Sequence, residues 1–395
     1  MLRIERDFSL DQVERALQAV VQGETALQLP HSIKTNAAGT EVALLQLIIS
    51  WARRAPEHST LRLHSKADDV RGQESFARTP FGLTALTMAR VVQSQSGDEL
   101  DRYGLLLMAR DYVVAMAEKP LAVLREYDKS TFPFLCIDNA REYRRPKRFY
   151  IPGTDRVRER PDFASLIKSC ASLLPVHRKL RHPEIFEAAA SLLYEAFQNT
   201  HDHAQTDYRG NILRRSVRGL LLNFQYVRLD ALAQAGGASA PLQSYYRNWR
   251  PDIASAQHAQ FLEIAIFDSG PGLARRWLKA EPALAGRLPE GNAIEDEYRA
   301  VIQCLHKGAT TKAGSTSGYG LFRIMHVVKR MGGLVRIRTG NLSLVKTFDG
   351  RDAPLTSEDL QLEDLERGGY DIARRAWAEG TSLSVLLPTN RAVGH

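Results

Sequence analysis

The stretch that decides how the chain is interpreted is Leu192-Leu-Tyr-Glu-Ala-Phe-Gln-Asn-Thr-His-Asp-His-Ala204. Its apolar residues recur at helical spacing, so a helix is expected. Glu195 and Asn199 are four residues apart and Asp202 follows three residues later, so their side chains share one side of that helix. An amide oxygen can ligate Mg²⁺, and a carboxylate can deprotonate a nucleophile. A solvated polar stripe has the same pattern, so the choice depends on the rest of the chain.

Three further motifs follow in order. A strand expected at 261–267 leads into Asp268-Ser-Gly-Pro-Gly272, a glycine-rich segment spans 307–321 and precedes a helix, and Gly380-Thr381 opens a final strand. Glycine permits turn dihedrals and a close approach of the backbone that other residues do not. Each of these motifs alone is also typical of an ordinary turn or polar loop.

Taken together and in this order, the four motifs resemble the ATP-binding domain shared by gyrase, the ninety-kilodalton heat-shock chaperone, histidine kinases and the mismatch-repair protein MutL, the GHKL superfamily. The resemblance covers about residues 180–390, roughly half of the chain. It implies an α+β protein with a C-terminal Bergerat-type α/β sandwich, in which a mixed sheet carries helices on one face.

The resemblance also implies a role for each motif. Glu195 would be the catalytic base, Asn199 would ligate Mg²⁺, and Asp268 would accept a hydrogen bond from the adenine amino group. Gly314–Gly320 would form the hinge of a lid, and the helix N-terminus that follows would favour the phosphates. The remaining implied nucleotide contacts are Asp202, Gly270, Gly272, Thr310, Thr311, Lys312, Gly318, Tyr319, Gly320, Leu321 and Thr381.

The residue type at position 195 indicates which reaction to expect. Gyrase-like ATPases and anti-sigma serine kinases carry Glu at this position, whereas classical histidine kinases more often carry His or Asn. The expected function is Mg²⁺-dependent ATP hydrolysis that drives a conformational switch. A kinase of the anti-sigma serine type or histidine-kinase-like type is an alternative, although the only His directly followed by an acid, His201, lies inside the nucleotide motif. A non-catalytic ATP-sensing scaffold or nucleic-acid-binding module is the third possibility.

The expected domain order is a smaller α/β domain at 1–140, a basic linker with a connecting helix at 141–180, and the ATP-binding domain at 181–395. The first domain is expected to alternate helices and strands, with further helices at 80–95 and 98–119 and a strand at 132–137. It has a faint resemblance to the sulfate-transporter/anti-anti-sigma (STAS) type of domain, without a phosphoacceptor motif, and could bind a protein partner. Insertions are expected near 231–258 and 341–379.

Residues 141–160 are the most basic stretch of the chain. They contain eight Arg or Lys residues and three acidic residues, with Tyr143, Phe149 and Tyr150 interleaved. Basic residues with aromatics can hold nucleic acid through phosphate contacts and stacking. A solvated linker between domains is the alternative interpretation, and the prolines of this stretch favour it.

Composition points to a cytoplasmic protein that does not enter a membrane. The 395 residues are 44% hydrophobic and 25% charged, and the formal net charge is +8. No apolar run reaches the ~18 residues that span a bilayer, and residues 1–7 lack the apolar core of a signal peptide. The three cysteines match no metal-binding spacing. The expected ligands are therefore ATP and Mg²⁺, with an unidentified protein partner and a homodimer as open possibilities.

Overall fold

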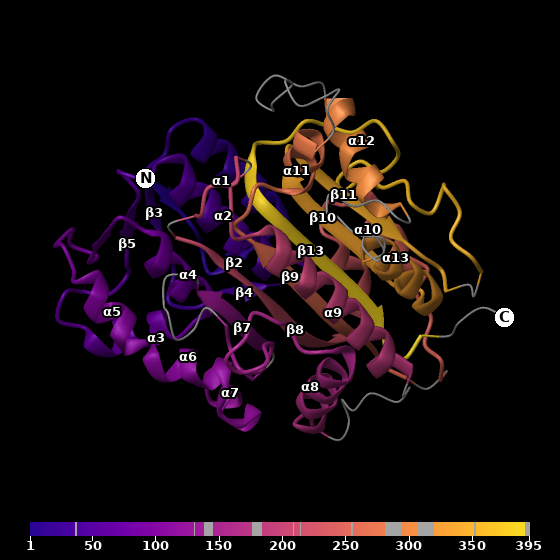
Figure 1. Ribbon diagram of the computed structural model, residues 1–395, viewed down its shortest axis with the longest axis horizontal. Helices are drawn as coiled ribbons and strands as arrows, with labels where there is room; N and C mark the ends of the chain where they lie inside the picture. The colour runs from indigo at the N-terminus through magenta and orange to yellow at the C-terminus, as the bar shows by residue number, and fades with distance from the viewer. Residues whose placement is uncertain are drawn as a thin grey trace.

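Helices and short strands alternate in the N-terminal half of the chain, and longer strands follow in the C-terminal half (Figure 1). The structure is a computed structural model that describes residues 1–35, 38–129, 131–137, 145–175, 184–207, 209–213, 215–253, 256–280, 294–306, 320–350 and 353–391. The strands are β1 (Leu2–Arg3), β2 (Asp7–Phe8), β3 (Ala26–Gln28), β4 (Lys34–Thr35), β5 (Thr60–Arg62), β6 (Val91–Gln93), β7 (Thr131–Ile137), β8 (Val217–Arg228), β9 (His258–Asp268), β10 (Leu334–Gly340), β11 (Leu342–Thr347), β12 (Glu363–Asp364) and β13 (Ala378–Pro388). The helices are α1 (Leu10–Val21), α2 (Thr40–Arg54), α3 (Val70–Ala77), α4 (Pro80–Met88), α5 (Arg102–Met108), α6 (Arg110–Ala117), α7 (Leu121–Tyr127), α8 (Arg160–Ser172), α9 (Glu184–His203), the 3₁₀ helix η2 (Leu229–Gly236), α10 (Ala240–Arg247), α11 (Leu273–Ala280), α12 (Ile294–Leu305) and α13 (Gly320–Met331).

Two main sheets organise these elements. The first has the order β1-β3-β5-β6 with parallel neighbours, as expected where helices connect successive strands. The second has the order β12-β11-β10-β13-β9-β8-β7 and is antiparallel at every pairing. A short parallel pair, β2-β4, lies outside both sheets. The chain is therefore of the α+β class, with a smaller α/β part at its N-terminal end.

Helix α2 connects the two sheets. Twelve of its residues between Thr40 and Ala52 are buried, so the helix has almost no solvent-facing side. It packs against α1 and α4 within the N-terminal half and against β13 and β9 of the antiparallel sheet. On the side of the parallel sheet, Trp51 Nε1 donates a hydrogen bond to the carbonyl of Thr25, next to β3, at 2.8 Å. Core residues of both halves consequently form one hydrophobic cluster.

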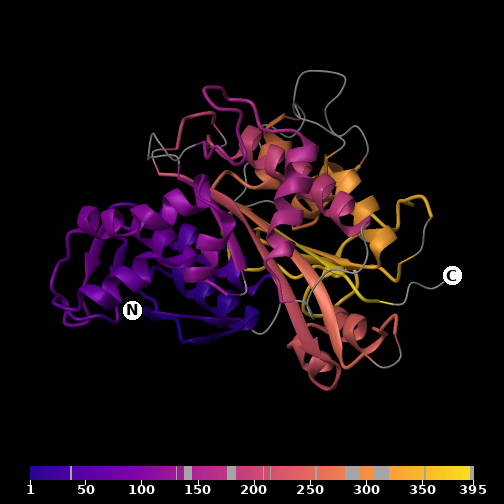
Figure 2. The same cartoon turned by 90° about the horizontal axis from the view of Figure 1, so that it is seen from below.

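The antiparallel sheet differs from the expected mixed sheet with helices on one face. All of its pairings are antiparallel, and both of its faces are covered. One face carries α9, α11, α12 and α13, with α8 packed on α9, while α2, η2 and α10 lie against the other face (Figure 2). Along β13, Leu383 and Val385 face one side and Ser382 and Ser384 face the other. The N-terminal half supplies α2 to this second cover, which the motifs of the C-terminal half could not reveal, whereas η2 and α10 come from the segment between β8 and β9.

Strand β7 corrects the expected domain boundary at residue 140. Each residue of β7, from Thr131 to Ile137, pairs with β8 of the antiparallel sheet, and all seven are buried. The rings of Phe132 and Phe134 pack edge-to-face against Phe224 and Phe149, whose elements follow in the chain. A cut at residue 140 would therefore remove an edge strand from the second sheet.

Two predicted helices of the N-terminal half are also corrected. The helix expected at 80–95 begins as predicted, with Thr79 accepting from the amide of Gly82, but it ends at Met88. Val91–Gln93 then pairs with β5 as strand β6, because its β-branched residues fill a parallel edge. The helix expected at 98–119 is interrupted at Ala109 into α5 and α6.

The expected insertion at 231–258 is helical rather than irregular. It contains most of η2 and all of α10, and Ser239 caps α10 by accepting from the amide of Leu242. Buried Tyr246 and Trp249 pack against Phe261 of β9, so the segment belongs to the core. The second expected insertion, 341–379, includes β11 and β12.

Two of the three aromatic residues of the basic stretch, Phe149 and Tyr150, are not available for stacking on nucleic acid. Phe149 and Tyr150 are each 1% exposed, and Phe149 stacks among Phe134, Phe163 and Phe197 in the core. The third aromatic, Tyr143, lies outside the described residues. Among the helices that the structure describes, none combines the length and apolarity needed to cross a membrane.

The first turn of α2 gives a testable dependence of stability on pH. Burial raises the pKa of Glu41 to about 8, and the nearby carboxylates of Asp128 and Glu263 add to the shift. The pKa of Glu41 is higher in the folded protein than its ordinary value of 4.5, so this group stabilises the fold fully below pH 4.5. That contribution is lost as the pH rises towards 8. The loss is at most about 1.4 kcal/mol per pH unit. Glu41→Gln should flatten the decline and raise the free energy of unfolding at pH 8, measured by urea denaturation at pH 5 and pH 8. Equal pH profiles in the variant and the wild type would contradict the assignment.

Candidate functional site

Helix α9 carries the first motif as predicted. Leu192, Leu193, Ala196 and Phe197 are at most 2% exposed and pack into the core. Glu195 and Asn199 lie on the opposite, half-buried side. Asp202 lies one turn further on, where Gln198 Nε2 donates to both of its carboxylate oxygens at 3.1 Å.

The N-terminal end of α13 lies directly against this pair. A Cβ atom at Gly320 would be 3.3 Å from Glu195 Oε2 and 3.3 Å from Asn199 Nδ2, so only glycine leaves both groups undisturbed. Leu321 follows in the same turn and is half-buried. The structure thereby brings the end of the third motif to the first. Thr310, Thr311, Lys312, Gly318 and Tyr319 lie outside the described residues.

Glu195 is held by two arginines. Arg160 Nη2 and Arg323 Nη1 both bind Glu195 Oε1, the latter at 2.6 Å. Arg160 comes from the first residue of α8, and its guanidinium also lies over the ring of Tyr194. The carboxylate side chain is 12% exposed, whereas the two arginine side chains are 43% and 49% exposed. One oxygen is therefore occupied by cations while the other faces Gly320.

The second and fourth motifs meet on neighbouring strands. Asp268, the last residue of β9, pairs in register with Thr381 of β13. The amide of Gly270 donates to Asp268 Oδ1 at 2.8 Å. The side chain keeps partial exposure at the strand end, but burial raises the pKa of Asp268 to about 6. Hydrogen bonds from the Gly270 and Thr381 amides and the charges of Arg276 and Arg218 oppose this shift and keep the carboxyl group ionised at neutral pH.

Glycines allow these strands and turns to approach closely. Gly380 has φ +70°, and a Cβ there would be 1.9 Å from the carbonyl oxygen of Asp268. Gly272 has φ +82°, and a Cβ there would be 2.8 Å from Thr339 Oγ1. Thr339 Oγ1 accepts from the amide of Leu273 at 3.1 Å and lies 3.3 Å from Thr381 Oγ1. Thr339 was not identified from the sequence, because nothing in its strand distinguishes it before the pairing with β13 is known.

Two further arginines, also missed from the sequence, link Asp268 to helix α9. Arg276 of α11 donates to the carbonyl of Asp202 at 3.4 Å, and its charge interacts with both Asp202 and Asp268. Arg218 of β8 is fully buried and donates to the hydroxyl of Tyr150 at 2.8 Å. Tyr150 in turn lies 3.0 Å from His201 Nδ1 on α9. The first, second and fourth motifs thus share one polar network.

The donor set fits Mg²⁺ bound mainly through phosphate and water. Within the described part of the chain, the side chain of Asn199 makes no hydrogen bond, so its amide oxygen is available as a ligand. No group of three or more His, Cys, Asp or Glu side chains suited to a metal ion occurs among the described residues. Mg²⁺ commonly uses one or two protein ligands beside substrate phosphates, so a single amide oxygen is compatible with that cation.

A separate cavity of ≈ 580 Å³ lies between α1 and the two expected insertions. Its wall includes Glu14, Ser343, Leu365 and Arg375. None of its lining residues belongs to the four motifs, so this cavity is separate from them.

The close approach at Gly380 can be tested independently of any ligand. Gly369 has φ +68° and open space where a Cβ would lie, whereas Gly380 has a similar φ and no space. Gly369→Ala should therefore lower the free energy of unfolding only by the cost of a left-handed alanine, about 1 kcal/mol. Gly380→Ala should lower it by about 1–3 kcal/mol more, the usual cost of overpacking. Denaturant unfolding of the two variants measures the difference, and equal losses would show that β13 does not approach Asp268 so closely.

Comparison with known proteins yielded no relative. No family model matches the chain, and neither the curated proteins nor the solved structures contain a match.

Proposed function

We propose that the chain binds ATP with Mg²⁺ between α9, the end of β9 and the start of α13, and hydrolyses it as a GHKL-type conformational switch. The observation that carries the proposal is the position of Gly320. It lies against both Glu195 and Asn199, at the N-terminal end of a helix, where backbone N–H groups and the helix dipole favour phosphate. A base, a cation ligand and an anion-binding helix end therefore converge.

The adenine would lie at Asp268. The ionised carboxylate of Asp268 is a hydrogen-bond acceptor at the end of β9, beside the hydroxyls of Thr381 and Thr339. An exocyclic amino group could donate to this carboxylate, which selects adenine over guanine because guanine presents a carbonyl at the same place. Gly270 and Gly272 carry no side chain that would block a flat ring.

The phosphates would lie beside Asn199, at the N-terminal end of α13. Mg²⁺, held by the amide oxygen of Asn199, would neutralise charge on the phosphate oxygens. Glu195 would accept a proton from the attacking water as the water oxygen bonds to the γ-phosphorus and the bond to the ADP oxygen breaks. General base catalysis of this kind contributes about 10²–10⁴-fold.

The arginines on Glu195 give the site a resting arrangement. Arg160 and Arg323 both donate to Glu195 Oε1, so this oxygen is already engaged before a substrate binds. Phosphate oxygens are good partners for guanidinium groups. In the proposed cycle, the triphosphate draws Arg160 and Arg323 from Glu195 Oε1, so that the base is released when the substrate is bound.

Incubation with ATP labelled at the γ-phosphate tests the proposal. Free labelled phosphate is the expected product. Label transferred to a protein hydroxyl would replace hydrolysis by a kinase activity. Binding without turnover would leave a nucleotide sensor, and no binding at all would reject the proposal.

Glu195→Ala should separate ATP binding from turnover. The change removes the proposed base but leaves Asn199, Asp268 and Gly320, so ATP should bind with at least the wild-type affinity. Turnover should fall by about 10²-fold or more. Glu187→Ala is the matched control, because Glu187 is an exposed carboxylate on the same helix and should not affect the rate. A wild-type rate in Glu195→Ala would remove Glu195 from the reaction.

Adenosine binding should weaken in acid as Asp268 becomes protonated. If only the ionised carboxylate binds well, the raised pKa of about 6 means that affinity falls by about tenfold between pH 7.5 and pH 5. Adenosine avoids the titration of the ATP phosphates. Asp268→Asn should bind weakly at both pH values and show no such dependence. Calorimetric affinities that are flat across this range in the wild type would contradict the role of Asp268.

A further inference from the structure

Strand β13 contains an irregularity where it meets the proposed adenine site. Thr339 pairs with Thr381, but the next residue, Gly340, pairs with Ala378. Glu379 and Gly380 are therefore extra residues in β13, and together with Thr381 we call them the bulge. Bulges commonly redirect side chains beside functional sites. This bulge places Gly380 against the Asp268 carbonyl and Thr381 in register with Asp268.

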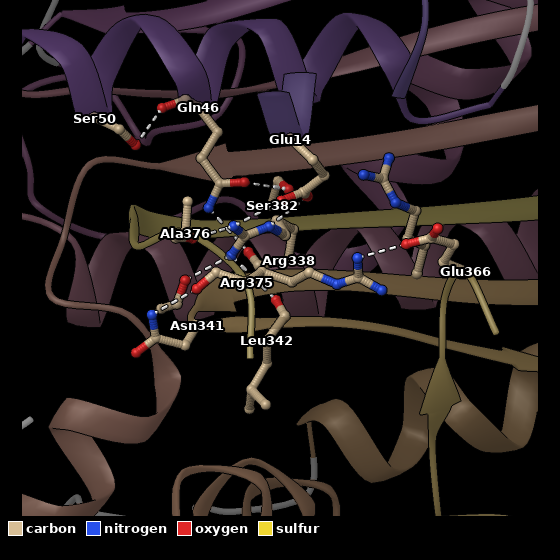
Figure 3. A network of polar contacts seen from close by, with 12 residues as sticks. Glu14, Gln46, Ser50, Arg338, Asn341, Leu342, Glu366, Arg375, Ala376 and Ser382 are labelled. Atoms are coloured by element: carbon tan, nitrogen blue, oxygen red, sulfur yellow. Dashed lines mark hydrogen bonds and ion pairs between the residues drawn. The ribbon is translucent and has the colours of Figure 1, made fainter. Parts of the chain in front are cut away.

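The bulge is held from the N-terminal half of the chain by Gln46 of α2 (Figure 3). Gln46 Nε2 donates to the carbonyls of Arg338 at 2.9 Å and Glu379 at 3.2 Å. Its Oε1 accepts from Ser382 Oγ at 2.9 Å. Both amide hydrogens and the amide oxygen of Gln46 therefore form hydrogen bonds with residues in or beside the bulge. Gln46 is 1% exposed, so water does not compete for these contacts.

Ser50, one turn further along α2, completes the attachment. Its hydroxyl accepts from the amide of Glu379 at 2.9 Å and donates to the carbonyl of Gln46 at 2.7 Å. The backbone amide and carbonyl of Glu379 are therefore both satisfied by α2 rather than by a neighbouring strand. A buried backbone group without a partner is costly, so the bulge depends on this helix.

Helix α1 holds the adjacent strand. Glu14 accepts from Arg338 Nε at 2.8 Å and from Nη2 at 3.2 Å, while Nη1 donates to the carbonyl of Gly340 at 2.6 Å (Figure 3). Arg338 and Thr339 are neighbours on β10, so their side chains point to opposite faces. Arg338 faces the N-terminal half, and Thr339 contacts Leu273 and Gly380 at the proposed nucleotide site.

We propose that Gln46 is a positioning residue of the nucleotide site, so that the docking of α2 and the binding of adenine are energetically coupled. The inference rests on the proposed function for its ligand. It gives the N-terminal half a role in forming the nucleotide site, in addition to the partner-binding role expected for this half. A molecule that loosens α2 would lower nucleotide affinity, and by linkage bound nucleotide would stabilise the docking of α2.

Gln46→Met tests the coupling, with Trp51→Phe as the matched control. Methionine keeps the length and the apolar packing but removes the three hydrogen bonds of the Gln46 side chain, to Arg338, Glu379 and Ser382. Trp51→Phe removes a buried hydrogen bond from the other side of the same helix, to Thr25. Gln46→Met should weaken ATP and adenosine by the same factor, about tenfold, because the adenine end is disturbed. Trp51→Phe should leave both affinities within about twofold while lowering stability. Wild-type affinity in Gln46→Met would overturn the inference.

A double-mutant cycle separates a positioning role from general destabilisation. If Gln46 acts through the bulge, Gln46→Met should reduce adenosine affinity much less in a Thr381→Ala background than in the wild type. Additive losses would show that Gln46 acts elsewhere. If Gln46→Met fails to fold, Ser382→Ala takes its place in the cycle. Ser382→Ala removes the hydrogen bond between Ser382 Oγ and Gln46 Oε1 from the side of the strand.

Hydrogen exchange without nucleotide distinguishes failure of this inference from failure of the proposed function. Gln46→Met should speed exchange of the Glu379–Ser382 amides, and Trp51→Phe should not. If the wild type binds no ATP, the proposed function fails and the exchange result still decides whether Gln46 holds the bulge. If ATP binds and exchange is unchanged in Gln46→Met, the inference alone fails.

Discussion

The burial of α2 is the constraint on which the rest of the structure depends. A helix buried on nearly all sides cannot leave polar groups unpaired, because each would cost about 1–3 kcal/mol. Gln46 and Ser50 face β13, and both bind the backbone of Glu379 in the bulge. Gln46 also binds the carbonyl of Arg338 on β10 and the hydroxyl of Ser382 next to the bulge. The same contacts satisfy the backbone of Glu379. The helix and the bulge therefore require each other, and this requirement joins the two halves into one cooperative core.

Two arginines, Arg218 and Arg276, add positive charge around Asp268. Arg218 is fully buried, lies over the faces of Tyr150 and Phe197, and donates to the Tyr150 hydroxyl. With Arg276 it provides positive charge near Asp268, whose carboxyl group would otherwise be more readily protonated by burial. The site consequently combines an acceptor for a neutral base with cations that suit a polyanion. This combination matches a nucleotide better than either feature alone.

The sequence predicted those parts of the fold that depend on local pattern. The helix expected over 192–204 from apolar spacing is the C-terminal part of α9, which begins earlier, at Glu184. The junction of β9 with its glycine turn followed from an apolar run that ends in Asp268. The membership of β7 in the second sheet, the strand at Val91 and the second cover of the sheet depend on pairing between distant segments, and their local patterns do not specify a partner. Likewise Arg160 is a site residue only because α8 packs on α9. Propensity alone does not encode such contacts.

The arrangement around Glu195 explains how one carboxylate can be held and still be released. Exposed ion pairs contribute only about 0.2–1 kcal/mol each, and the side chains of Arg160 and Arg323 are 43% and 49% exposed. Two such pairs orient Oε1 without binding it tightly, so a triphosphate can displace them at little cost. Glu195 itself is only 12% exposed, and α13 covers its other oxygen at Gly320. The carboxylate would therefore keep its place if the arginines left, as the base role proposed for Glu195 requires.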